Sequence, residues 1–152
     1  MKYTVVPAFF FRKESAYEIL SEAVQLSGTD KVEYKELPQY KAVLVYAYGE
    51  DEDASVPVVA RLVESSKRIR EHNKLAVYYG ESYVSIVIAT GDKLLLANSY
   101  PADDPVTAEY FVFASLKQFQ INPQVTTIYI LKPVVGEMTD DLVKYFKGVE
   151  TI

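Results

Sequence analysis

The sequence predicts a compact, soluble α/β domain built on a mixed sheet, for three reasons. The chain has 152 residues and 49% of them are hydrophobic, which is enough to enclose a core. Three strand-like segments between residues 75 and 100 have very short connections, which indicates an antiparallel meander. A helical segment follows them, and then the continuous apolar run TTIYIL, which is typical of a buried parallel strand.

The N-terminal segment predicts a strand and then a helix. Residues 3–11 form a β-rich run, and Pro7 within it suits an edge strand or an irregular first strand. Apolar residues recur at helical spacing from Ala16 to Val24. Gly28 is the expected stop of this helix, because glycine readily ends helices in a left-handed conformation.

Two strands and a second helix are expected next. The strands VEYKEL and AVLVYAY lie on either side of Pro38. We expect a helix over residues 56–71 with Ser55 as its N-cap. Lys67, Arg68 and Arg70 crowd its last turns, where basic side chains complement the helix dipole or, alternatively, form a basic binding patch.

The C-terminal half begins with the meander LAVYYG, YVSIVIAT and KLLLANSY, whose second connection, Gly91-Asp92, is a good two-residue hairpin turn. Asp104 and Pro105 predict the start of a helix that extends to about Gln120. This helix is apolar nearly all round, so we expect it to be buried.

A last helix is expected after the TTIYIL strand. Thr139 is its predicted N-cap, with Asp140 and Asp141 in the first turn and apolar residues from Leu142 to Phe146. We therefore expect a partial N-terminal lobe over residues 1–74 and a second lobe over residues 75–152, joined in one compact unit.

Composition argues against several classes of function. The net charge of -5 would on average repel a nucleic-acid backbone, and the absence of cysteine removes disulfides and thiolate chemistry. His72 is the only histidine, so a catalytic triad or a zinc site has no support, and we expect its side chain to be solvated. Apolar segments are too short to cross a membrane. We expect a cytoplasmic protein with no metal, no cofactor, no nucleic-acid partner and no membrane partner.

The second half resembles a lobe of the ribonuclease H-like and actin-like ATPase superfamily, in which three antiparallel strands precede a helix, a parallel strand and a helix. The resemblance places Val77-Tyr78-Tyr79-Gly80 where active members carry an aspartate and a phosphate-binding glycine turn. Tyr78 replaces the aspartate, and Glu81-Ser82-Tyr83 replaces small residues that approach phosphate. The later turn survives as Thr90-Gly91-Asp92-Lys93.

The whole chain is similar to an uncharacterised family found mainly in Bacteroidetes, thought to have an actin-like fold. Members carry further N-terminal strands that are not seen before Tyr3, so this resemblance implies an incomplete first lobe. It implies no catalytic residue. The matching segments are Val6 to Phe9, Ala42 to Tyr48, Lys93 to Tyr100, Pro105 to Phe111 and Gly136-Glu137.

Three functional hypotheses follow. The first is a non-catalytic protein-interaction or scaffold domain, with a protein partner or self-association. The second is a nucleotide-binding, ATPase-like protein that uses non-standard residues, for which Gly80, Ser82, Ser85 and Lys93 are the candidates. The third is a ligand-binding or enzymatic domain of another α/β fold with tyrosines lining its pocket.

Overall fold

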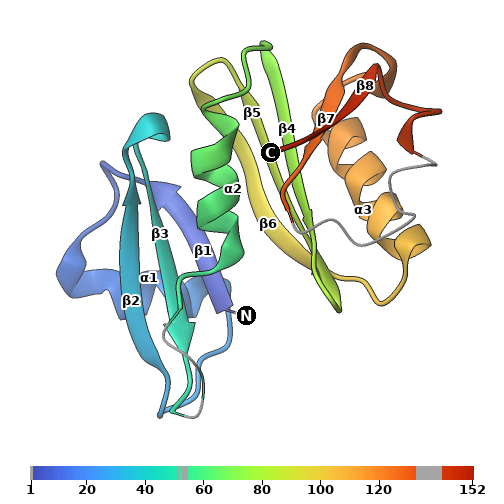
Figure 1. The fold of residues 1–152 in the computed structure, drawn as a ribbon. Helices are drawn as coiled ribbons and strands as arrows, with labels where there is room; N and C mark the ends of the chain where they lie inside the picture. The colour runs from blue at the N-terminus through green and yellow to red at the C-terminus, as the bar shows by residue number, and fades with distance from the viewer. Residues whose placement is uncertain (1, 51, 53–54, 133–141) are drawn as a thin grey trace. The chain divides into compact units, whose positions relative to one another are not determined.

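The computed structural model describes residues 2–50, 52, 55–132 and 142–152. The chain divides into two compact units, residues 1–60 and residues 61–152, and the division falls within helix α2 (Val58–Ser66). Figure 1 shows the order of the elements along the chain. The described part contains no helix that is long and apolar enough to cross a bilayer.

The first unit is a three-stranded antiparallel sheet with one helix against it. Its strands are β1 (Lys2–Pro7), β2 (Lys31–Leu37) and β3 (Ala42–Tyr48), in the spatial order β1-β3-β2. Helix α1 (Ala16–Ala23) packs Leu20 against Val43, Val45 and Ala47 of the central strand. The predicted strands around Pro38 are therefore confirmed, and β1 is the expected edge strand.

The second unit is a mixed five-stranded sheet in the order β6-β5-β4-β7-β8. Antiparallel pairing joins β4 (Asn73–Tyr79), β5 (Tyr83–Thr90) and β6 (Lys93–Pro101), which confirms the predicted meander. Strand β7 (Thr127–Ile130) pairs parallel with β4, and β8 (Gly148–Thr151) pairs parallel with β7. The predicted mixed α/β architecture is therefore confirmed.

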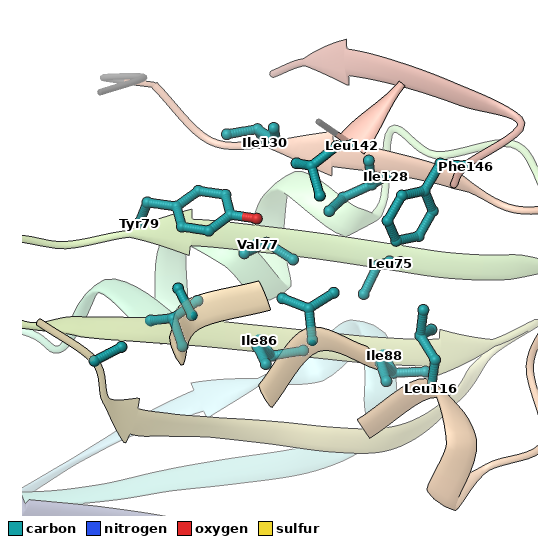
Figure 2. Close-up of a cluster of buried hydrophobic side chains, with 14 of the residues drawn as sticks. Leu75, Val77, Tyr79, Ile86, Ile88, Leu116, Ile128, Ile130, Leu142 and Phe146 are labelled. Atoms are coloured by element: carbon teal, nitrogen blue, oxygen red, sulfur yellow. The ribbon is translucent and has the colours of Figure 1, made fainter. Parts of the chain in front are cut away.

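The core of the second unit lies between this sheet and helix α3 (Pro105–Gln118). Side chains alternate between the two faces of a strand, so every second residue of β4 and β5 faces the helix. The central members of the core are large, buried aliphatic side chains (Figure 2). They are Leu75, Val77, Ile86, Ile88, Val112, Leu116, Ile128 and Ile130.

Several predicted helix and strand boundaries are wrong. Strand β1 ends at Pro7, and Phe9, in the turn that follows, is 91% exposed. Helix α1 ends at Ala23 rather than near Gly28, because Val24 adopts an extended backbone with φ of -138° and packs on the core.

The other helices also differ in extent. Helix α2 begins three residues after Ser55 and stops at Ser66, so Ser55 is not its N-cap, and the basic residues that follow lie beyond its last turn. Helix α3 ends at Gln118, two residues earlier than expected. One side of α3 packs on the sheet, as expected, whereas the other side is exposed, with Val106 at 76% and Tyr110 at 65%.

The predicted last helix falls mostly outside the described residues, including Thr139, Asp140 and Asp141. Within the described part, Leu142 and Phe146 are buried in the core, and the Phe146 N–H donates to the Leu142 carbonyl at 3.0 Å. Residues 143–145 form turns rather than a helix. Strand β8 follows and was not predicted.

Candidate functional site

The connection between β4 and β5 is the candidate site, because active relatives of the resembled superfamily bind phosphate at this hairpin. Gly80 follows β4, and its N–H donates to the Tyr83 carbonyl at 2.8 Å. A Cβ atom on Gly80 would lie 2.5 Å from Cε1 of the Tyr83 ring. Any larger residue at this position would displace the ring, so the glycine permits the close approach of Tyr83.

Tyr78 and Tyr83 form an aromatic pair beside this turn. Their ring centroids are 6.0 Å apart and the rings are inclined by 40°, a separation at which aromatic rings attract. Burial, and secondarily the neighbouring Tyr78, raises the pKa of the Tyr83 hydroxyl above its usual value. Tyr83 is thus a neutral phenol at pH 7. It cannot take the place of the carboxylates that hold magnesium in nucleotide sites.

The remaining candidates do not gather around Gly80. Ser85 is buried within β5, and its Oγ lies 2.6 Å from Oγ of Ser99 on β6, so the hydroxyl is engaged inside the sheet. Ser82 is exposed, and its carbonyl accepts from the Ala102 N–H at 3.1 Å.

Lys93 lies at the other end of the β5–β6 hairpin. It begins β6 opposite Thr90, while Tyr83 begins β5, a strand of 8 residues. At about 3.4 Å per residue, the two ends of β5 are about 24 Å apart. The structure therefore does not bring Lys93 together with Gly80 and Ser82.

Tyr79 faces the opposite side of β4 from Tyr78 and enters the core (Figure 2). Its side chain is 2% exposed, and its hydroxyl has no hydrogen-bond partner among the residues that the structure describes. Burial raises the pKa of Tyr79 strongly above its ordinary value of 10.0, and the charge of Glu109 raises it further. An unpartnered buried hydroxyl costs stability, and it forms no part of an open site.

The residues considered for metal or acid–base chemistry have structural roles or lie in solvent. No group of residues suited to a metal ion occurs in the described ranges. His72 is exposed in the turn before β4, as predicted, and its carbonyl accepts from the Gly91 N–H. Asp104 caps α3, accepting from the Thr107 N–H at 2.8 Å, which confirms the predicted cap.

The comparisons with known proteins agree with this architecture. The model of a family described as "Protein of unknown function (DUF3822)" matches residues 1–56 and 52–148. The chain belongs to this family. No protein with curated annotation matches the chain.

A solved structure also matches. It is a protein of unknown function with an actin-like ATPase fold from Bacteroides thetaiotaomicron VPI-5482, with a TM-score of 0.80 and 18% sequence identity. The match covers 99% of this chain and 65% of that one, so this chain spans about two thirds of its length. The likeness shows that the chain has an actin-like fold, and the predicted resemblance is confirmed.

The sequence predicted a replacement at Tyr78, which stays a prediction, and the contact of Tyr83 with Gly80 and Tyr78 was missed. The Tyr83 ring contacts Gly80 and Tyr78 across the hairpin. The contact arises because side chains alternate between the two faces of each strand, which places these residues on the same face. The pairing of two serines across β5 and β6 was also missed. The register set by the turn at Gly91 would pair Ser85 with Asn98, and a register shift between Ile88 and Ala89 moves its partner to Ser99, so the turn alone could not reveal this pair.

Proposed function

We propose that the protein is a non-catalytic domain with an actin-like fold that acts as a protein-interaction or scaffold module. The observation that carries the proposal is the Tyr78–Tyr83 pair, whose second ring lies over Gly80 in the hairpin where active relatives bind phosphate. A phosphate oxygen needs free backbone N–H groups in such a turn. Here the Gly80 N–H is already donated to the Tyr83 carbonyl.

An interaction role is supported by the exposed side of α3. Val106 and Tyr110 are one helical turn apart and exposed at 76% and 65%. Tyr145 adds a third exposed side chain, held edge-on to Phe113 of the same helix with ring centroids 5.4 Å apart. Protein-binding surfaces often expose apolar side chains.

Thermal unfolding with nucleotides tests the catalytic half of this proposal. The unfolding midpoint should be the same with and without millimolar ATP, ADP or GTP plus magnesium, because the proposal holds that none of them binds. A ligand that binds only the folded state would raise its stability and therefore the midpoint. A rise of several degrees would instead support the nucleotide-binding hypothesis. The variant Tyr83→Ala then serves as a comparison, since it uncovers the turn at Gly80.

Sedimentation velocity over a range of protein concentrations tests the association half. If α3 mediates self-association, Tyr110→Ser should shift the distribution toward the monomer. Lys117→Ser, at another exposed position of the same helix, is the matched control. A monomer at all concentrations would leave a different protein as the only partner compatible with the proposal.

A further inference from the structure

A basic pocket lies within the second unit, away from the β4–β5 hairpin. It has a volume of about 450 Å³ and is formed by the C-terminal part of α2 together with the residues that follow β7 and β8. Eight residues line it: Arg61, Glu64, Ser65, Lys67, Arg68, Leu131, Lys132 and Ile152. Four of them are cations and one is a carboxylate, although the chain as a whole has a net charge of -5.

The four cations are exposed, and none forms an ion pair within the described ranges of the chain. Like charges held close together repel one another, and an anion between them would relieve that repulsion. Glu64 is the one acidic side chain in the lining, against four cationic side chains.

Part of this basic lining is held in position. Nη2 of Arg68 donates to Oγ of Ser65 at 3.2 Å, and Ser65 itself is 6% exposed. Lys132 is fixed at its backbone, where its N–H donates to the Ile152 carbonyl at 3.1 Å. A guanidinium that is already oriented loses less entropy when it binds an oxyanion in a forked geometry.

The walls of the pocket are not purely polar. Leu131 is 4% exposed and Ile152 is half-buried, so apolar surface lies beside the cations. The volume is within the range of small-molecule pockets, which combine apolar walls with a few polar groups. We propose that this pocket binds a small molecule through an oxyanionic group, a phosphate or a carboxylate.

The pocket shares no residue with the β4–β5 hairpin, so its occupancy is independent of the proposed function. The sequence pointed to Lys67 and Arg68 as a possible basic patch near the end of a helix. The structure adds Arg61 and Lys132 to them across the pocket, while Arg70 does not line it.

Isothermal titration calorimetry of the full chain at low ionic strength tests this proposal with two probes, pyrophosphate and citrate. We expect saturable binding of at least one, and the stronger probe identifies phosphate or carboxylate as the preferred group. Binding should weaken in 0.5 M sodium chloride, because exposed charges are screened. Arg68→Gln should weaken binding about tenfold, the effect of losing one charged hydrogen bond.

Lys93→Gln is the matched control, because it removes the same charge from an exposed position on β6 outside the pocket. Circular dichroism of each variant checks that the fold is retained. The absence of saturable binding by both probes would overturn the proposal. An equal loss of affinity in Lys93→Gln and Arg68→Gln would also overturn it, since it would mean that the anion responds only to net charge.

Discussion

Replacing Tyr79 by phenylalanine should stabilise the protein. The Tyr79 side chain is 2% exposed, and no described residue forms a hydrogen bond with its hydroxyl, so folding removes the hydroxyl from water without compensation from that part of the chain. Such an uncompensated group costs about 1–3 kcal/mol. The ring itself stays packed on β4 beside Val77 and is unchanged by the substitution (Figure 2).

We therefore expect Tyr79→Phe to raise the free energy of unfolding by about 1 kcal/mol, toward the lower end of that range because the lost oxygen leaves a small void. Urea unfolding followed by circular dichroism measures the change, with a shift of midpoint at constant slope. Tyr78→Phe is the matched control, since Tyr78 is half-buried and its hydroxyl is not among the unpartnered buried groups.

The same substitution gives a pH dependence with a definite sign. Because burial raises the pKa of Tyr79 above 10.0, the folded state holds this proton more tightly than the unfolded state. The stability linked to this proton is fully present below pH 10.0 and falls as the pH rises above it. Wild type should lose stability faster than Tyr79→Phe above that pH. The cost assigned to this hydroxyl would be refuted if Tyr79→Phe were less stable than wild type and both lost stability at the same rate above pH 10.0.

Three further predictions concern single side chains. Gly80→Ala should lower the free energy of unfolding by about 1 kcal/mol or more, because its Cβ would lie 2.5 Å from the Tyr83 ring. Gly28→Ala is the control, since a Cβ at that position meets nothing within 4 Å. Equal urea midpoints for the two variants would contradict the close approach. Ser85→Ala should lower the free energy of unfolding by about 1 kcal/mol in the same assay, because it removes a hydrogen bond of a buried side chain in the sheet. An unchanged midpoint would show that this bond contributes nothing. Asp104→Ala should lower the thermal midpoint at pH 7, because it removes the cap of α3. A backbone N–H in the first turn of α3 holds the pKa of this carboxylate below 3.8, so the difference from wild type should shrink as the pH falls below that value. A constant difference down to pH 2 would exclude the charged cap.

Local sequence signals were sufficient for much of the second unit. The turn at Gly91, where φ is +60°, determines the β5–β6 hairpin, because few residues other than glycine adopt that conformation without strain. Asp104 and Pro105 likewise define the start of α3 through a cap that involves only neighbouring residues.

The ends of the helices depended on tertiary contacts. Val24 leaves the helical conformation and packs on the core of the first unit, although its apolar side chain continues the helical pattern. Strand β8 is only 4 residues long, and its parallel pairing with β7 comes from a distant part of the chain. Periodicity over so short a segment cannot distinguish a strand from a loop.

The sequence by itself predicted the actin-like fold, and the resemblance implied that Tyr78 stands where active members carry an aspartate. Only the tertiary structure decided what fills the hairpin and where the basic residues lie. Tyr83 covers Gly80 because strand register brings the two together, and Lys132 joins Arg68 in one pocket although 63 positions separate them along the chain. The pocket depends on the packing of distant segments, which local residue preferences do not encode, whereas Gly80 and Tyr83 meet through the geometry of one hairpin.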